Sequence, residues 1–268
     1  MAELKGPILF TGSVGGVRAY YDKVLKRYTL STKGGSTKEI INNNPTMARQ
    51  RENMSEFKAC SKWASQLRKS LDSIGHLHYG YYYPDIVGLA KLIQKQDYQG
   101  IKGSRAIESS KYSKLLKSIN FNKEHPFDQV FVNQYEILFS DDKQSITLKL
   151  IGFRSKIRIN WPTHFESYRI ALVCSQQPDW VWNTLDKKYR PIIDNLQFKS
   201  VTTFTDWRIP GNAEEDIILT ASFASPALQY PGTTVVVALG LEVSAYPLDS
   251  SITNTSGVGT MKIVECFV

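Results

Sequence analysis

The chain has 268 residues, of which 42% are apolar and 22% charged, values typical of a folded, water-soluble protein. Its cysteines, Cys60, Cys174 and Cys266, are far apart, which argues against a disulfide-dense fold and gives no spacing for a zinc site. The formal net charge of +8 is uneven, because residues 1–125 hold 21 Lys and Arg against 10 Asp and Glu, whereas the remaining residues are slightly acidic.

The first 44 residues are predicted to form an extended β-arm followed by a loop. Three short strands are expected at residues 8–11, 17–21 and 27–31, with glycine-rich links that readily adopt positive φ between the first two. The polar stretch 31–43, with two consecutive glycines and the start of an asparagine run, predicts a loop. Because the arm has few apolar residues for a core of its own, we expect it to lie on another surface.

The next region, residues 45–122, is predicted to be helical. Its strongest signal is a helix that starts at Pro45, because Asn44 is a good N-cap and proline suits the first helical position. This helix is expected to end near residue 74. Apolar residues at steps of seven, three and four predict one packed stripe along it: Met47, Met54, Phe57, Ala64, Leu67, Leu71 and Ile74. Shorter helices are expected from residue 85 and over residues 106–119.

From residue 123 to residue 268 the apolar pattern changes to a period of two, which predicts a domain of antiparallel strands. Strands are expected at residues 130–132, 135–139, 145–152, 156–159, 167–174, 201–205, 216–224, 233–244 and 261–268. Many short strands with regular turn signals favour a β-sandwich. The predicted fold class is therefore α+β, with an N-terminal β-arm and three helices followed by an antiparallel β-sandwich.

No motif in the sequence indicates a catalytic or metal site. His76 and His78 would project together only from a strand and have no third ligand nearby. The glycine-rich stretch 12–16 lacks the Gly-Lys-Ser/Thr of a phosphate-binding loop and predicts a tight turn. The acidic clusters 141–142 and 214–216 are expected to be solvated rather than catalytic. We therefore expect no enzymatic activity, cofactor, metal or small-molecule substrate.

The β-rich half is also rich in tryptophan. Trp180 and Trp182 flank a single residue and would share one face of a strand. A buried aromatic pair is favoured over a platform for carbohydrate or peptide, and the exposure of Trp180, Trp182 and Trp207 distinguishes the two.

Tyrosines and cations interleave between Arg18 and Tyr28. Such residues can stack on bases and neutralise phosphates, and they are also enriched at protein–protein contacts. We expect contact with a second protein surface; nucleic-acid binding and a plain solvated surface without a partner are the alternatives. The residues predicted to make this contact are Tyr20, Tyr21, Arg27, Tyr28, Arg49 and Arg51.

Three segments near the start of the chain occur in a distinctive order. They are Gly12-Ser13-Val14-Gly15-Gly16-Val17, Lys33-Gly34-Gly35, and Asn44-Pro45-Thr46 followed by Gln50-Arg51-Glu52-Asn53 and Ser55-Glu56-Phe57. In this order they resemble the opening of a family of uncharacterised proteins from Bacteroidota. The resemblance implies an immunoglobulin-like β-domain after the arm and helices. It implies no established function and no site residues.

The expected function is that of a non-enzymatic structural subunit that self-assembles into a ring, shell, tube or filament, with an opening similar to phage-type structural proteins. Opposite charges on the two halves favour head-to-tail attraction between copies. A nucleic-acid-binding protein that uses the basic half is the alternative. The start of the chain lacks an apolar signal region, and no apolar run approaches about 18 residues, so we expect a cytoplasmic protein without membrane insertion. Release by cell lysis would leave no mark in the sequence.

Overall fold

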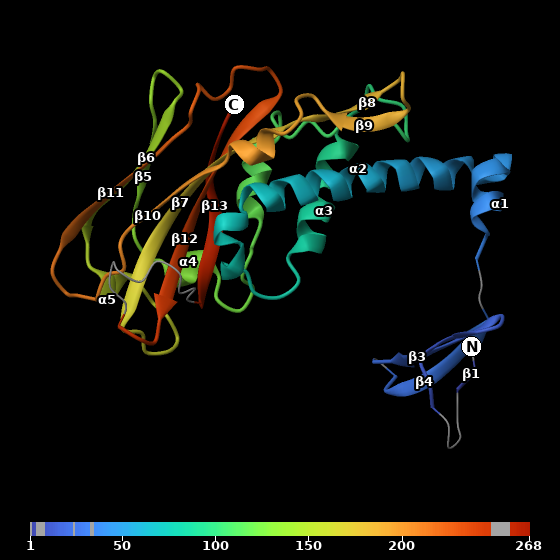
Figure 1. The fold of residues 1–268 in the computed structure, drawn as a ribbon, viewed down its shortest axis with the longest axis horizontal. Coiled ribbons are helices and arrows are strands. Elements are labelled where there is room, and N and C mark those ends of the chain that lie inside the picture. Colours follow the sequence, from blue (N-terminus) through green and yellow to red (C-terminus); the bar gives the residue numbers. More distant parts are fainter. Residues whose placement is uncertain (1, 4–8, 24, 33–34, 248–257) are drawn as a thin grey trace. The chain divides into compact units, whose positions relative to one another are not determined.

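Helices and antiparallel sheets are combined in this chain, as seen in a computed structural model that describes residues 2–3, 9–23, 25–32, 35–247 and 258–268. The chain divides into two compact units, Met1–Arg51 and Glu52–Val268. Helix α2 (Ala48–Ser70) begins in the first unit and continues into the second. Figure 1 shows that each unit contains sheet structure of its own.

The first unit contains a four-stranded antiparallel sheet, the arm sheet. Its strand order is β1-β4-β3-β2, with bounds β1 (Ala2–Glu3), β2 (Gly12–Val14), β3 (Val17–Asp22) and β4 (Arg27–Thr32). The strands expected at 17–21 and 27–31 are confirmed. The strand expected at 8–11 is wrong over residues 9–11, and Ile8 lies outside the described residues. The strand falls at β2 because a tight turn at Gly15 and Gly16, with Gly15 at φ +57°, sets Val14 opposite Val17.

The loop expected over residues 31–43 is wrong in its second half, where helix α1 (Lys38–Asn43) forms, and residues 33–34 lie outside the described part. Thr37 caps this helix, since its Oγ1 accepts a hydrogen bond from the Ile40 N–H at 3.3 Å. Asn44 in turn caps the 3-10 turn η1 (Pro45–Met47) by accepting from the Thr46 N–H at 3.0 Å. The predicted cap at Asn44 is confirmed, and the asparagines before it end a helix.

In the second unit, α2 and α3 (Tyr83–Lys95) pack together against one face of a sheet. The helix predicted from residue 85 is confirmed to within two residues. The stripe predicted on α2 is buried from Ala64 onward, but Met54 and Phe57 are 54% and 59% exposed. The side chains of α2 are buried only along the part of the helix that α3 and the large sheet cover. The buried residues of α2 are Glu56, Ala59, Cys60, Trp63, Ala64, Gln66, Leu67 and Ser70.

Three other predicted elements are wrong. Over residues 106–119 only the 3-10 turn η3 (Ser113–Ser118) forms, because Ile107 exchanges backbone hydrogen bonds of 2.8 and 3.0 Å with Trp180 and so joins a β-bridge. In place of strands at 130–132 and 156–159, the chain forms four-residue helices, α4 (Phe127–Val130) and α5 (Ser155–Arg158). Apolar runs this short fit the helical period as well as the strand period.

Two antiparallel sheets and a hairpin make up the rest of the second unit. The large sheet has the order β10-β7-β12-β13, the small sheet has the order β11-β6-β5, and β8 pairs with β9. Apart from the two errors above, the strands predicted after residue 123 are confirmed, with shifted ends. The bounds are β5 (Glu136–Phe139), β6 (Ser145–Phe153), β7 (Ser167–Pro178), β8 (Trp180–Asn183), β9 (Lys188–Pro191), β10 (Val201–Phe204), β11 (Glu215–Ser222), β12 (Thr233–Ser244) and β13 (Val258–Phe267), with 3-10 turns η2 (Asp72–Leu77) and η4 (Leu196–Lys199).

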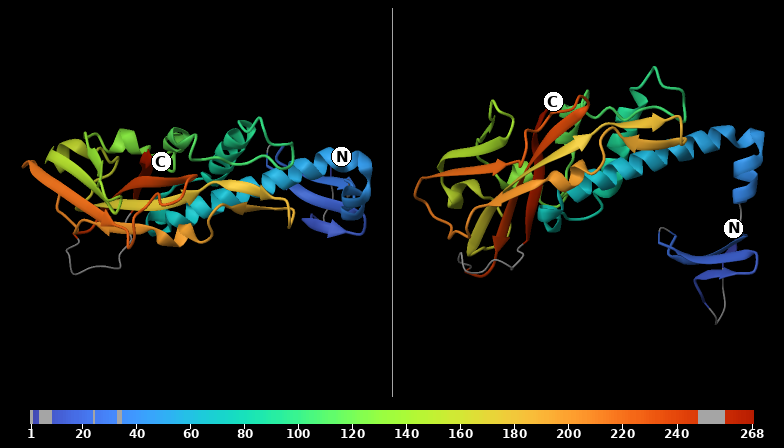
Figure 2. Two further views of the ribbon diagram at one scale, coloured as in Figure 1. Left: turned by 90° about the horizontal axis from the view of Figure 1, so that it is seen from above. Right: turned by 45° about the horizontal axis from the view of Figure 1, so that its top comes forward.

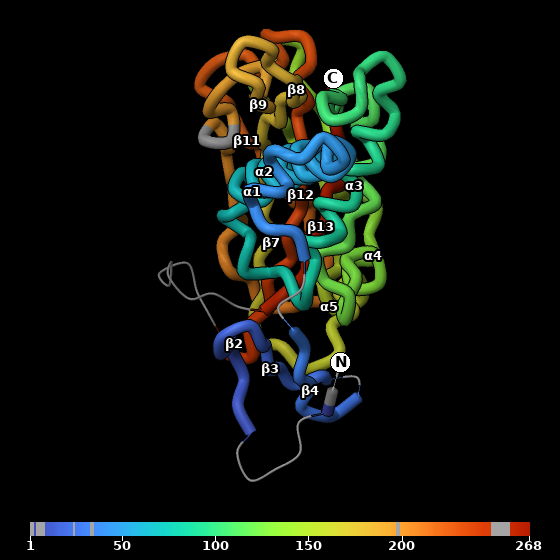
Figure 3. Tube along the Cα trace, turned by 90° about the vertical axis from the view of Figure 1, so that its right-hand side faces the viewer, coloured from blue at the N-terminus to red at the C-terminus, as the bar shows by residue number. Residues whose placement is uncertain are grey.

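The large sheet is buried on both faces, and all twelve residues of β12 are buried. One face packs on α2 and α3 in a core that includes Trp63 and Val236, and the other packs on the small sheet in a core that includes Leu148 and Leu239. Within the second unit, helices, large sheet and small sheet therefore form successive layers, as Figures 1 and 2 show. Seen from the helical side in Figure 3, α2 and α3 lie over β7, β12 and β13. Burial on both faces explains the nearly continuous apolar sequence of β12.

Candidate interaction surface

Two of the residues predicted to make contacts, Tyr21 and Tyr28, are direct cross-strand partners on β3 and β4. Their ring centroids are 5.1 Å apart and the rings meet edge to face at 64°. Such pairs stabilise neighbouring strands while leaving part of each ring accessible. Tyr21 is 45% exposed and Tyr28 is half-buried, so the structure brings these two residues together on one accessible surface.

The face of the arm sheet that carries these tyrosines is mostly apolar. Directly opposed residues of paired strands project to the same side of a sheet. On this basis the apolar members of this face, which we call the apolar arm face, are Val14, Val17, Ala19, Tyr21, Tyr28 and Leu30. Ala19 is buried, whereas Val14 is 66% exposed. The arm sheet therefore combines a small packed centre with apolar surface at its margin.

The other face of the arm sheet is polar and carries two more of the predicted residues, Tyr20 and Arg27. The guanidinium of Arg18 lies 5.9 Å from the centroid of the Tyr20 ring, within the range of a cation–π contact. Arg27 Nη1 is 3.9 Å from a carboxylate oxygen of Glu3. The tyrosine-rich segment is thus divided between two faces, and the strict alternation along β3 is the sequence signal that could have separated them.

Arg51 has a structural role that sequence reasoning missed. Its Nη1 donates hydrogen bonds to the carbonyl oxygens of Ile41 at 2.7 Å and Asn44 at 2.8 Å. These carbonyls lie in the last turn of α1 and immediately after it, so Arg51 ties α1 to the first turn of α2. Arg49 is exposed in that same turn of α2. Neither arginine belongs to a strand of the arm sheet.

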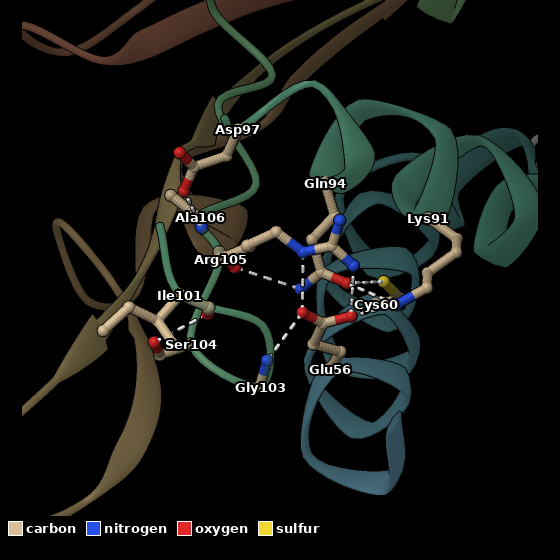
Figure 4. Close-up of polar contacts among 10 residues, drawn as sticks. All are labelled: Glu56, Cys60, Lys91, Gln94, Asp97, Ile101, Gly103, Ser104, Arg105 and Ala106. Atoms are coloured by element: carbon tan, nitrogen blue, oxygen red, sulfur yellow. Dashed lines mark hydrogen bonds and ion pairs between the residues drawn. The ribbon is translucent and has the colours of Figure 1, made fainter. Parts of the chain in front are cut away.

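A buried ionic network surrounds Glu56 of α2, a residue that the sequence did not single out. The fully buried Glu56 carboxylate accepts hydrogen bonds from Arg105 Nε at 2.8 Å and Nη2 at 2.7 Å, from the Gly103 N–H at 2.9 Å, and from Lys91 Nζ (Figure 4). Burial by itself raises the pKa of Glu56, but these donors outweigh burial and lower the pKa to about 2. Glu56 is therefore ionised at neutral pH.

Gln94 of α3 completes this network. Its Oε1 accepts hydrogen bonds from Lys91 Nζ at 3.0 Å and from Cys60 Sγ at 3.4 Å, and its Nε2 donates to the Arg105 carbonyl at 3.1 Å (Figure 4). Burial raises the pKa of the Cys60 thiol to about 11, which keeps the thiol protonated at neutral pH. Because these groups bond to one another, the network fixes the segment containing Gly103 and Arg105 against α2 and α3.

A second buried carboxylate, Asp179, lies between β7 and β8. It accepts hydrogen bonds from Ser109 Oγ at 3.0 Å, from the Ser110 N–H at 2.8 Å and from Ser110 Oγ at 2.6 Å. Burial raises the pKa of Asp179, and the serine hydrogen bonds offset this effect only in part. These bonds hold the segment before η3 in place, which is a further reason why no long helix forms there.

The paired histidines and the acidic clusters do not form joint sites. His76 Nε2 lies 3.0 Å from Glu242 Oε1, whereas the ring of His78 packs against Tyr82 with centroids 4.5 Å apart. In the cluster 214–216, Glu214 pairs with Arg154, Glu215 with Tyr168 and Arg208, and Asp216 with the Gly152 N–H. Asp142 caps its own turn by accepting from the Gln144 N–H at 3.0 Å. His76, His78, Asp142 and the three acids of the cluster 214–216 thus contact separate neighbours.

The low exposure of two of the three tryptophans favours a role in the core over a platform for carbohydrate or peptide. Trp180 and Trp207 are each 7% exposed, and Trp180 Nε1 donates to Gln66 Oε1 at 2.7 Å. Trp182 packs edge-on against Tyr189 with ring centroids 5.1 Å apart. Two of the three side chains are therefore inaccessible to a carbohydrate or peptide.

We find no metal site and no membrane-spanning helix among the described residues, and the comparisons with other proteins gave no match. Within the part of the chain that the structure describes, no group of three or more His, Cys, Asp or Glu side chains is placed to hold a metal ion. None of the helices in that part has the length and apolar character needed to cross a membrane. No family model matches the sequence, and no significant match was found among curated proteins or among solved structures.

Proposed function

We propose that the protein is a non-enzymatic structural subunit that self-assembles, through its arm sheet, into a ring, shell, tube or filament of phage-like type. The observation that carries the proposal is the apolar arm face, where Tyr21 and Val14 are 45% and 66% exposed beside the half-buried Tyr28. Fully burying an apolar side chain of this size contributes roughly 1.5–3 kcal/mol. Tyrosine adds a large contact area at low conformational cost and is frequent at the centre of interfaces.

A small sheet with two different faces is suited to assembly. The Tyr21–Tyr28 pair offers surface to a partner, while the polar face with Arg18 and Arg27 keeps the other side hydrated. A single contact of a few kcal/mol is weak, but a closed ring or a filament repeats it in every copy. The arm sheet therefore supports a repeated contact better than a tight binary complex.

The finer architecture of the second unit belongs to the same proposal. We infer that its large and small sheets form an immunoglobulin-like β-sandwich, as the resemblance to the Bacteroidota proteins implies. Support comes from the antiparallel pairing in both sheets and from the shared core in which Leu148 and Leu150 of β6 face Leu172 and Leu239 of the large sheet. The helices on the far face of the large sheet are an addition to such a sandwich.

Light scattering coupled to size-exclusion chromatography tests the proposal. The unmodified protein is expected to elute as a species larger than one chain, and Tyr21→Glu is expected to shift it to the monomer because a charge on the apolar arm face opposes burial. Tyr20→Glu, the same substitution one residue away on the polar face, is the matched control and should leave the assembly intact. Tyr21→Phe should also assemble. A wild-type monomer at high concentration would contradict the proposal.

Nucleic-acid binding is the second candidate, favoured by two specific observations. The first unit carries nine Lys and Arg against three Asp and Glu, a net charge of +6, and Arg18 lies over Tyr20 on its polar face. Cations beside an accessible ring could neutralise phosphates and stack on bases. A gel shift with a single-stranded oligonucleotide at low salt separates the two functions, since this candidate requires binding that Tyr20→Ala weakens and that added salt abolishes.

A further inference from the structure

The outer face of the small sheet is a second surface with exposed apolar residues. Side chains alternate along β11 and β6, so that Leu219 and Leu150 enter the core while Ile218 and Ile151 point outward, 60% and 64% exposed. Leu138 of the edge strand β5 is also outward and 39% exposed. We call Leu138, Ile151 and Ile218 the outer patch. Ile218 lies directly opposite Lys149, so Ile151 and Ile218 are diagonal neighbours across the β6–β11 pair and form the apolar part of this surface.

The register places charges within this patch as well as at its margin. Lys149 of β6 lies opposite both Ile218 of β11 and Glu136 of β5, and its Nζ is 3.8 Å from the Glu136 carboxylate. Residues 136–153 and 214–222 together hold six Asp and Glu against two Lys, a net charge of −4. Arg154 and Arg208, which pair with two of these acids, reduce the net charge to −2. The small sheet is thus acidic even after its ion pairs are counted.

Charge distinguishes the outer patch from the exposed apolar residues of helix α2. Met54 and Phe57 are also more than half exposed, but helix α2, on which they lie, holds six Lys and Arg against two Glu. By net charge alone, the first unit of another copy, at +6, would be repelled by α2 and attracted by the small sheet. Such long-range complementarity steers association and penalises wrong pairings.

The geometry points to a docking site for the arm: the apolar arm face of one copy packs on the outer patch of a second copy. This inference rests on the proposed self-assembly and names the surface that receives the arm. Two sheets can pack face to face at about 10 Å, with their side chains interdigitating between them. Tyr21 and Tyr28 would then lie against Ile151 and Ile218, with the lysines of the β3–β4 turn facing the acids of the small sheet. The contact is heterologous, so repeating it generates a ring or a filament.

A complementation experiment tests this pairing. The sheet variant carries Ile151→Lys and Ile218→Lys, which replace outward side chains and repel the basic arm; the arm variant carries Tyr21→Glu. Met54→Lys with Phe57→Lys is the matched control, because it changes two equally exposed apolar residues on the basic helix. Thermal unfolding followed by circular dichroism checks that each variant is folded, and the single Ile218→Lys replaces the sheet variant if the double substitution unfolds it.

Light scattering is expected to show monomers for the sheet variant alone and for the arm variant alone, and a wild-type assembly for the α2 control. In a one-to-one mixture of the sheet and arm variants at the highest protein concentration, the average mass is expected to rise from the monomer toward twice the monomer mass and no further, because one intact arm meets one intact patch through a single weak contact. A folded sheet variant that assembles like wild type, or a mixture that stays monomeric, overturns the inference but leaves self-assembly standing. A wild-type monomer overturns the proposed function as well.

Discussion

Glu56 and Arg105 form a bidentate ion pair in the interior of the second unit, with Arg105 Nε and Nη2 at 2.8 and 2.7 Å from the Glu56 carboxylate. Parallel N–H···O bonds of this kind are among the stronger side-chain contacts in proteins. The pair joins α2 to a loop that is 49 residues distant in sequence. The Glu56 carboxylate is fully buried. Removing its charge should therefore change the free energy of unfolding by a measurable amount.

We predict that Glu56→Gln lowers the free energy of unfolding at pH 7 by about 3 kcal/mol, because it leaves Arg105 and Lys91 without their buried counter-charge. Chemical denaturation measures the loss. Glu108→Gln, which breaks the solvent-exposed pair between Glu108 and Lys111, is the matched control and should cost far less, because water screens an exposed ion pair. Equal losses in the two variants would show that burial of the Glu56 network adds nothing.

The same variant has a predicted pH dependence. The pKa of Glu56 is lowered from 4.5 to about 2 on folding, so the unfolded state binds the proton more readily between these values. The stabilising contribution is complete above pH 4.5 and is lost as the pH falls toward 2. The stability of Glu56→Gln should therefore fall less steeply than that of wild type over this range, as measured by denaturation at a series of pH values.

The contribution of Asp179 to stability should depend on pH in the opposite sense to that of Glu56. Burial raises its folded pKa above the ordinary value of 3.8, so its contribution to stability decreases as the pH rises through the window above 3.8. Asp179→Asn removes the buried charge and keeps an oxygen that can accept from Ser109 and Ser110. We predict a change of less than about 1 kcal/mol at pH 7 and a flatter pH profile in that window. A loss as large as that of Glu56→Gln would contradict this assignment.

Glycine substitutions test the packing of β13 against β12. A Cβ at Gly259 would lie 2.0 Å from the Leu241 carbonyl oxygen, whereas a Cβ at Gly88, inside α3, meets nothing within 4 Å. Gly259→Ala is expected to destabilise the fold by about 3 kcal/mol or more, because a backbone atom of a central strand must move. Gly88→Ala is expected to stabilise it by up to roughly 1 kcal/mol. Thermal unfolding of both variants provides the comparison, and similar melting temperatures would argue against the predicted overlap.

The proposed assembly should be sensitive to salt. The screening length falls from about 10 Å at 0.1 M to 3 Å at 1 M ionic strength, so attraction between the basic arm and the acidic small sheet weakens. Light scattering at increasing sodium chloride is expected to show dissociation. Lys23→Gln with Lys26→Gln should assemble more weakly at low salt and show a smaller salt effect. Assembly that strengthens with salt would show that the contact is held by apolar burial alone.

Long, strongly periodic elements could be predicted from the sequence, and short ones could not. The cap at Asn44, helices α2 and α3, and the strands β6, β7, β11, β12 and β13 carry enough residues for the period to decide. The segments that became α4 and α5 contain four residues each, and tertiary bonds to Trp180 and Asp179 override the helical pattern before η3. The apolar periodicity of a short segment cannot predict hydrogen bonds to residues about 70 positions away in the sequence.

The residues of the proposed contact surface could be assigned to one face from the sequence only in part. The aromatic and basic composition located the arm, and the structure places Tyr21 and Tyr28 together on one face of it. Tyr20 and Arg27 face the other way, and Arg51 binds the carbonyl oxygens of Ile41 and Asn44. The pairing register decides the face of each strand residue, and that register depends on the turns at both ends.

The burial of every side chain in β12 bears on how this protein can diverge. A strand with water on one side tolerates substitution at every second position, whereas β12 has no position free of packing constraints. Sequence change should therefore accumulate in the arm and in the outward residues of the small sheet. If those two surfaces meet, drift in one selects for compensating drift in the other, so that lineages would lose the ability to co-assemble while keeping the same interior.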